Sequence, residues 1–447
     1  MTELRLRDPG TVSIYVCGPT VYDVPHIGHG RAALVYDILV RYLEWRGLTV
    51  RYVSNITDID DKIIERAAAQ GRSPGELAHT CEAAYWEALD GLGVRRPHHT
   101  PRATEYVAAM IALIAELESA GVAYPAPGGV YFDTRRLDGY GLLAHQALES
   151  LRAGERVAVV EGKRSPLDFV LWKASKPGEP AWESPWGAGR PGWNTECVVM
   201  SLELLGDGFD LHAGGLDLKF PHHENERAQA VALGRNFARH WMHHAFVEVA
   251  GEKMSKSLGN FTSLVDLLAR HDGRAYRLLT LQSHYRRPME VTPAAMAMAE
   301  EAVAKLDNLA RRVARTTAHA AGAGAGPASR ERFVSAMDDD LDTPRALSVI
   351  FGAARAANAA LDGGDTAGAA WMMATVAELS GAVGLELRAE TGDIDPGTAA
   401  LAAERDAARA ARDFARADAL REQLQASGWV VEDTPAGARL HRGTDGP

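Results

Sequence analysis

Two short polar segments of this 447-residue chain contain residue types that handle phosphate groups. His26-Ile27-Gly28-His29 places two imidazoles around a glycine, whose missing Cβ lets a phosphate chain approach the backbone. Lys253-Met254-Ser255-Lys256-Ser257 is a compact cationic loop with hydroxyl donors. When a carboxylate attacks the α-phosphate of ATP, pyrophosphate leaves, and positioned cations and donors stabilise the charge that accumulates. Together the two segments favour activation of a carboxylate by ATP.

Each segment alone has a simpler interpretation. A lone H-x-G-H is more often a loop of hydrogen-bonded histidines, and a lone lysine–serine loop is usually a solvated turn. The argument for a nucleotide site rests on finding both segments in this order, a sheet's length apart.

Four residues elsewhere carry side chains that bind metals. Pro221 fits the first position of a predicted helix, on which His222 and Glu226, four residues apart, share one face. With Cys17 and Cys197 they would form a mixed sulfur, nitrogen and oxygen site suited to Zn²⁺. The spacing alone leaves another interpretation open, in which the cysteines are core residues and the His-x-x-x-Glu pair is a surface contact.

The surrounding elements predict a parallel nucleotide-binding sheet. Residues 13–16 form a short apolar strand, apolar residues repeat at helical spacing over 34–43, and residues 50–53 form a second strand. Gly47 is the expected end of the helix. This order is a βαβ unit, and the loop between its first strand and helix, which contains His26, is where an open parallel sheet binds ligands.

The rest of the chain changes composition in a way that predicts a split sheet domain. Residues 115–190 are rich in Pro, Gly and Trp and form the expected insertion between two halves of a Rossmann-type domain, 1–114 and 191–261. A helical, Ala-rich region over 262–390 and a small module over 391–447 follow.

Composition limits the class of protein. Hydrophobic residues make up 46% and charged residues 24%, with no apolar run long enough for a membrane span and no secretory signal at the N-terminus. Three cysteines are too few for a disulfide framework, and Cys81 lies outside every motif as a packing residue. We therefore expect a cytosolic enzyme. Because the net charge is −11, a nucleic acid would have to bind through a local basic patch.

The two phosphate-handling segments match the HIGH and KMSKS motifs of class I aminoacyl-tRNA synthetases, which the chain resembles. The resemblance implies that His26 and His29 stabilise the transferring phosphate, and that Lys253 and Lys256 hold the leaving pyrophosphate. It also implies Mg²⁺ with ATP. The other residues that it assigns to ATP are Gly28, Gly214, Gly215 and Asp217, the last a candidate for the ribose.

Segments 17–23, 55–62 and 220–226 resemble cysteinyl-tRNA synthetases in particular. In that family the matching positions hold zinc, and the thiolate of the substrate joins as a further ligand. The zinc ligands so implied are Cys17, Cys197, His222 and Glu226, and the residues implied for the cysteine pocket are Gly18, Thr57 and Trp193.

A zinc ion would solve a problem of selectivity. Serine differs from cysteine by one atom, and an apolar pocket separates such near-isosteres by only about 1–3 kcal/mol. Zinc prefers a thiolate to a neutral hydroxyl and helps to deprotonate the thiol. A separate editing domain would then be unnecessary.

The resemblance continues to the C-terminus. Segment 337–344, read alone as an acidic cap before a helix, is similar to the start of the family's helical anticodon-side domain, and segments 413–418 and 431–437 are similar to its anticodon-reading module. The resemblance implies ATP, L-cysteine and tRNA(Cys) as partners, and we expect a monomer.

Three departures from the family pattern stand out. Asn194 and Thr195 replace the usual His and Ile before Glu-Cys, and Ala213 replaces a glycine. Leu440 replaces a tryptophan that would stack on an anticodon base, an interaction worth about 1–3 kcal/mol per base. This last change predicts weaker anticodon recognition.

Two alternative functions remain. A ligase that joins cysteine to a small amine, as in mycothiol-pathway enzymes that resemble this family, would lack the terminal module, so the tail after Asp395 favours tRNA. A non-catalytic, tRNA-binding paralogue would not need Lys253 and Lys256.

Overall fold

The computed structural model describes residues 3–144, 162–249, 252–253, 262–316, 325–389, 396–434 and 437–442. The chain divides into two compact units. The first comprises Met1–Ala269, Thr280–Thr292 and Ala382–Gly384, and the second comprises Arg270–Leu279, Pro293–Gly381 and Leu385–Pro447. The five domain ranges expected from the sequence stay a prediction. Within the described residues, no helix is both long and apolar enough to cross a membrane.

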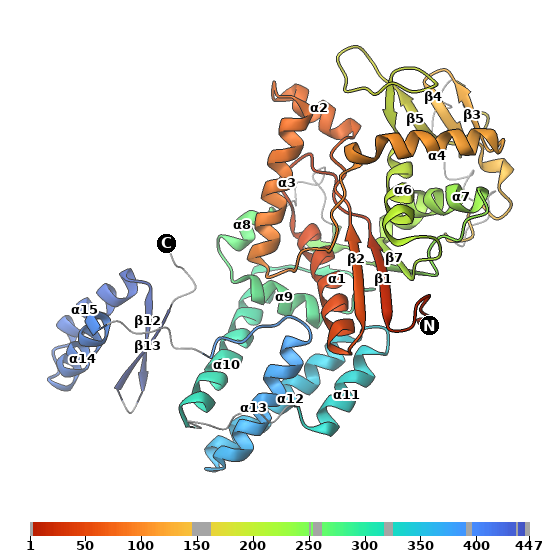
Figure 1. The fold of residues 1–447 in the computed structure, drawn as a ribbon. Coiled ribbons are helices and arrows are strands. Elements are labelled where there is room, and N and C mark those ends of the chain that lie inside the picture. Colours follow the sequence, from red (N-terminus) through yellow and green to blue (C-terminus); the bar gives the residue numbers. More distant parts are fainter. Residues whose placement is uncertain are drawn as a thin grey trace. The chain divides into compact units, whose positions relative to one another are not determined.

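The first unit is built on a four-stranded sheet in the order β2-β1-β7-β8, with every pair parallel (Figure 1). The predicted βαβ unit is present, with α1 joining β1 to β2. Because β1 has β2 on one side and β7 on the other, the strand order reverses there, and an open sheet binds ligands at the carboxyl ends beside such a point. The elements are β1 (Thr11–Val16), α1 (Ile27–Trp45), β2 (Thr49–Ser54), β7 (Leu211–Gly215) and β8 (His240–His244).

Helix α1 is held by an apolar stripe and ends where the sequence predicts. Leu34, Ile38 and Tyr42 are buried at helical spacing. The chain leaves the helix through Gly47, whose φ of 85° is a conformation that favours glycine. The N-terminus of α1 follows β1 through a short loop and so lies on the side of the sheet where the strands have their carboxyl ends.

A second sheet is formed by the segment that lies in the sequence between β2 and β7 of the parallel sheet. It is antiparallel, in the order β3-β4-β5-β6, and α4 packs on β3 and β5 (Figure 1). Its buried side chains, such as Val130 and Trp172, belong to the same core as Tyr15 of β1. The elements are α4 (Val107–Ser119), β3 (Ala123–Ala126), β4 (Gly129–Phe132), β5 (Phe169–Ala174) and β6 (Gly189–Pro191).

Helices and short strands complete the first unit. Cys81 of α3 is buried among Val21, Ile63 and Leu77, so it is a packing residue, as predicted. The remaining elements of this unit are α2 (Asp61–Ala69), α3 (Pro74–Gly91), the 3₁₀ turns Ala103–Tyr106 and Thr134–Arg136, α6 (Trp193–Leu205), α7 (Glu224–Ala232), β9 (Val247–Val249), β10 (Glu252–Lys253), α8 (Leu264–Leu268) and β11 (Met289–Glu290).

The second unit is mainly helical. The predicted acidic cap is present at α12, where the Asp342 side chain accepts a hydrogen bond from the Arg345 N–H and Pro344 lies in the first turn. The elements are α9 (Gly273–Gln282), α10 (Pro293–Thr316), α11 (Pro327–Met337), α12 (Thr343–Asp362), α13 (Thr366–Gly381), α14 (Pro396–Ala410), α15 (Phe414–Ala426) and an antiparallel hairpin of β12 (Trp429–Thr434) and β13 (Gly437–Arg442).

Leu440 is a core residue of this last hairpin. It is 5% exposed and packs in one cluster with Leu424, Trp429 and Val431. A side chain buried to this degree is not available to stack on a base. Leu440 thus offers no base-stacking surface, and the expectation of weaker anticodon recognition stays a prediction.

Candidate functional site

The four residues expected to bind a metal lie together at the carboxyl end of β1. Cys17 directly follows this strand, Cys197 lies in α6, and His222 and Glu226 come from the turn before α7 and from α7 itself. One ligand atom from each residue lies within 4.8 Å of every other. Residues far apart in the sequence thus converge on one point.

The start of α7 agrees with the prediction that Pro221 opens the helical segment. Phe220, the residue before it, is extended at φ −142° and ψ 133°, because a residue before proline is driven out of the helical region. From Pro221 the chain turns helically, the Glu224 N–H donates to the Pro221 carbonyl, and the regular helix α7 follows. His222 and Glu226 lie on one face, with Nε2 and Oε1 3.0 Å apart.

The separations in this set fit one tetrahedral zinc ion. Zinc bonds of about 2.3 Å to sulfur and about 2.1 Å to nitrogen or oxygen imply edges of about 3.8 Å for S–S, 3.6 Å for S–N or S–O and 3.4 Å for N–O. The Cys17 and Cys197 sulfurs are 3.5 Å apart, Cys197 Sγ is 3.7 Å from His222 Nε2, and Cys17 Sγ is 3.5 Å from Glu226 Oε1. These three edges, and the 3.0 Å edge between His222 Nε2 and Glu226 Oε1, lie within about 0.4 Å of the expected values.

Burial sets the protonation states of these groups. It raises the pKa of the Cys17 thiol and of the Cys197 thiol, and it lowers the pKa of His222 to about 4. Burial also acts to raise the pKa of Glu226, but His212 and His222 beside it outweigh this effect and lower its pKa overall. Near pH 7 the group therefore holds two thiols, a neutral imidazole and a carboxylate.

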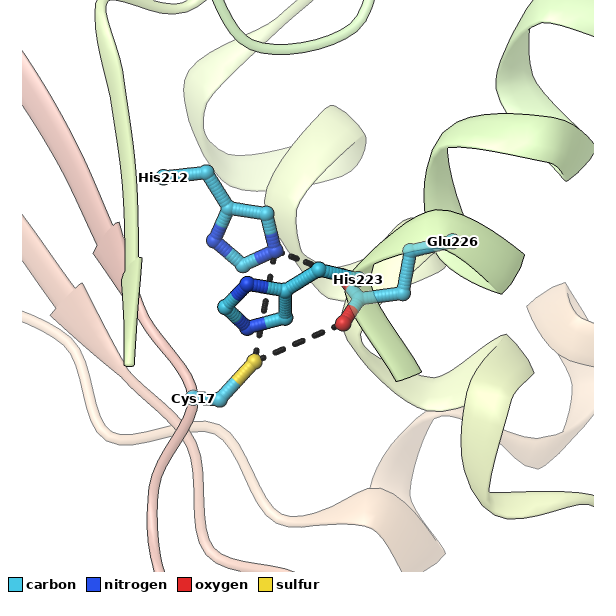
Figure 2. A group of neighbouring side chains, drawn as sticks. All are labelled: Cys17, His212, His223 and Glu226. Carbon is cyan, nitrogen blue, oxygen red and sulfur yellow. Dashed lines mark hydrogen bonds and ion pairs between the residues drawn. The ribbon is translucent and has the colours of Figure 1, made fainter. Parts of the chain in front are cut away.

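A second set shares Cys17 and Glu226 with the first and adds His212 and His223 (Figure 2). His212 Nε2 lies 2.6 Å from Glu226 Oε2, and the N–H of Ala213 donates to the other ring nitrogen of His212. The ring of His212 thus orients the carboxylate, whose Oε1 atom faces Cys17 and His222. We therefore assign His212 to the support of the ligand set.

His212 was not identified from the sequence. A single histidine inside a buried strand carries no pattern that marks it as a partner of Glu226, 14 residues later.

A cavity of about 400 Å³ opens beside the four-residue set. Its wall includes residues predicted to contact the thiol of the substrate and residues predicted to contact the phosphates of ATP. The two predicted sites therefore share one cavity. The predicted residues that line it are Cys17, Gly18, His26, Gly28, His29, Trp193, Gly215 and Asp217.

The two histidines of the HIGH segment are fixed at the N-terminus of α1. Their rings stack with centroids 3.8 Å apart, and the N–H of His26 donates to His29 Nδ1 over 3.1 Å. In a neutral imidazole an accepting Nδ1 leaves the proton on Nε2. His29 therefore presents an N–H donor, next to a helix N-terminus that favours negative charge.

Three glycines allow close approaches at the cavity wall, which Gly18 and Gly215 line, or directly beside it. A Cβ at Gly18 would lie 1.6 Å from the carbonyl oxygen of Asn55, and one at Gly215 would lie 2.4 Å from Asp217 Oδ1. At Gly214 it would lie 3.0 Å from the ring of His223. Any side chain at Gly18 would displace the backbone, so glycine is required there.

The other expected site residues are placed as follows. Trp193 is 38% exposed and stacks on the ring of His222 with centroids 3.9 Å apart. Thr57 does not line the described cavity: it is buried, and its hydroxyl donates to Glu196 Oε2 over 2.8 Å. Lys253 lies in β10, and Lys256 lies outside the described residues.

Comparison with known proteins places the chain in a family. It is 48% identical over 445 residues to the cysteine–tRNA ligase of Halorhodospira halophila, with 97% of this chain and 96% of that protein covered. The chain belongs to the cysteinyl-tRNA ligase family. The cysteine–tRNA ligase of Thioalkalivibrio sulfidiphilus is similarly close, at 47% identity over 447 residues, with 98% of this chain and 96% of that protein covered.

Three family models match successive parts of this cysteinyl-tRNA ligase family member. Residues 4–301 match the tRNA synthetases class I (C) catalytic domain, residues 332–388 a DALR domain, and residues 391–439 the cysteinyl-tRNA ligase anticodon binding domain. The fold is that of class I synthetases.

Solved structures agree on this fold. Mycobacterium tuberculosis methionyl-tRNA synthetase in complex with methionyl-adenylate is similar with a TM-score of 0.62 at 17% identity, covering 83% of this chain and 89% of that one. A putative arginyl-tRNA synthetase from Campylobacter jejuni gives a TM-score of 0.55 at 13% identity, covering 85% and 94%.

Proposed function

We propose that this member of the family activates L-cysteine with Mg-ATP and transfers it to the 3′ end of tRNA(Cys). The main support for the proposal is one cavity whose wall includes both Cys17, a member of the four-residue metal-ligand set, and His29 of the HIGH segment. A substrate thiol and an α-phosphate would then be held in the same cavity. ATP-dependent charging of tRNA with labelled cysteine tests the proposal.

The two chemical steps place clear demands on the site. In the first, a carboxylate oxygen of cysteine bonds to the α-phosphorus while the bond to the β-phosphate oxygen breaks and pyrophosphate leaves. In the second, a terminal ribose hydroxyl attacks the activated carbonyl and AMP leaves. The Nε2–H of His29 stabilises the phosphate oxygens in the first step, and we assign the pyrophosphate to Lys253 and Lys256.

Selection of the side chain falls to the thiol end of the cavity. Zinc, when held by Cys17, Cys197, His222 and Glu226, supplies a centre that prefers a thiolate to a hydroxyl. Trp193, stacked on His222, and Gly18, which leaves no room for a side chain, form walls around the substrate. At the nucleotide end we assign Gly28, Gly214, Gly215 and Asp217 to ATP.

Zinc binding is expected to release about two protons per ion near pH 7. The raised pKa values of the Cys17 and Cys197 thiols keep both protonated in the metal-free protein, whereas neutral His222 and ionised Glu226 bind through lone pairs and release no proton. Affinity should therefore rise about 100-fold per pH unit while the thiols remain protonated. Calorimetry in buffers of different ionisation enthalpy measures this number, and release near zero would remove the thiols from the ligand set.

The alternative acceptor, a small amine, is disfavoured by residues 391–439, which match an anticodon binding domain. A non-catalytic role is disfavoured by the intact cavity, which keeps both HIGH histidines. We further propose a monomer that acts in the cytosol, which sedimentation velocity and cell fractionation would test.

A further inference from the structure

Asn194, where the family pattern expects histidine, contacts one of the proposed zinc ligands. It lies in the first turn of α6, three residues before Cys197, and its Oδ1 atom is 3.1 Å from His222 Nδ1. Position 194 therefore lies at the back of the ligand set, on the side of His222 that faces away from it.

The two nitrogens of His222 have different surroundings. Nε2 faces the ligand set, 3.0 Å from Glu226 Oε1 and 3.7 Å from Cys197 Sγ. Nδ1 faces the amide of Asn194. A neutral imidazole carries one proton, and a metal needs the lone pair of the nitrogen that it binds. The ring can bind a metal through Nε2 only if the proton sits on Nδ1.

The amide oxygen of Asn194 favours this tautomer. It is an acceptor without a proton of its own, so it pairs with His222 only when Nδ1 carries the hydrogen. With the amide reversed, its NH₂ group would donate to Nδ1 and the ring proton would move to Nε2, where it would block the metal. The oxygen-facing orientation is thus the one that suits a ligand.

Neighbouring groups hold both partners in place. Gln229 Nε2 donates to the backbone carbonyl of Asn194 over 2.7 Å. The ring of Trp193 lies on that of His222, with 16° between the planes. His222 is 1% exposed, so water does not compete for Nδ1. Trp193 therefore restrains the imidazole by stacking on its face, and Asn194 restrains it through the hydrogen bond at Nδ1.

We propose that Asn194 is a positioning residue that fixes the tautomer of His222 and so prepares Nε2 for zinc. This inference rests on the proposed zinc site and adds a residue to it. A metal-binding histidine usually donates its second ring N–H to a carboxylate or a backbone carbonyl. Here the amide oxygen of Asn194 would accept that hydrogen bond.

The test compares zinc affinity among three variants by competition with a chromophoric chelator at pH 7. Asn194→Leu keeps the approximate volume but removes the acceptor, and we expect its Kd for zinc to rise about 10–100-fold. Asn194→Asp restores an acceptor at a partly exposed position, and its Kd should stay within about threefold of wild type or fall below it. The absorption of bound Co²⁺ gives a second readout of the geometry at the ligands.

Tyr140→Phe is the matched control. The Tyr140 hydroxyl donates to Asn225 Oδ1 over 2.6 Å, so this change also removes a buried hydrogen bond close to the turn that carries His222, and Tyr140 is itself not a member of either ligand set. Its zinc affinity should match wild type. A purely structural role for position 194 would not be rescued by aspartate.

Two results would overturn the role of Asn194 while leaving the zinc site intact. One is wild-type zinc affinity in Asn194→Leu, and the other is equal weakening in Asn194→Leu and Asn194→Asp. Absence of zinc from the wild-type protein would instead overturn the proposed zinc site, and the role of Asn194 with it.

Discussion

Cys197→Ser is expected to abolish stoichiometric zinc binding and to lower cysteine-dependent pyrophosphate exchange by at least about 100-fold. Changes to residues that only support a metal ligand cost about 10–100-fold in affinity, and loss of a ligand costs more. A serine hydroxyl in this buried position stays protonated and is a poor substitute for the sulfur, which lies 3.5 Å from Cys17 Sγ. Metal content by elemental analysis and exchange of labelled pyrophosphate measure the two effects.

Cys81→Ser provides the control for this experiment. Cys81 is buried in a separate cluster and belongs to neither ligand set. In both variants a buried sulfur is replaced by a hydroxyl oxygen. A loss of stability caused only by burying a hydroxyl would therefore appear in both. Zinc content and exchange should be retained in Cys81→Ser. Full zinc occupancy in Cys197→Ser would contradict the ligand assignment.

His29→Asn is expected to lower the rate of cysteinyl-adenylate formation by about 10²–10³-fold, the usual cost of removing one donor that stabilises transition-state charge. The asparagine amide can replace Nδ1 as the acceptor for the His26 N–H, but it is too short to replace the Nε2–H donor. The fold, zinc content and KM for cysteine should therefore change little, while kcat falls. Single-turnover formation of adenylate separates the chemical step from binding.

His98→Asn tests whether this loss is specific to the cavity. His98 accepts the N–H of Tyr52 at Nδ1 over 3.0 Å, the same kind of bond that His29 makes, but it does not line the cavity. Its substitution should leave adenylate formation unchanged. Equal rates for wild type and His29→Asn would show that this imidazole does not act on the phosphate.

Local spacing explains why much of this site could be predicted. The pair His222 and Glu226 is separated by about one helical turn, so its shared face follows from the sequence. The end of α1 was predictable because the chain leaves the helix with a positive φ at Gly47, and glycine, which has no Cβ, adopts this conformation easily. The parallel sheet followed from the order of strand, helix and strand.

The contacts that were missed depend on tertiary packing. His212 of β7 contacts Glu226 of α7, and Asn194 contacts His222 in the turn before α7, the helix on which α6 packs. Leu440 is buried because the hairpin folds it onto Trp429 and Leu424. Periodic patterns in the sequence do not reveal these contacts between elements, because they depend on how the helices and strands pack.

Charging of tRNA(Cys) with labelled cysteine or labelled serine, by zinc-loaded and metal-stripped protein, tests the central claim most directly. Selection by coordination predicts ATP-dependent charging with cysteine by the zinc-loaded protein, loss of this activity on stripping, recovery on adding zinc, and no charging with serine. Metal-stripped protein that charges cysteine and serine alike would contradict it.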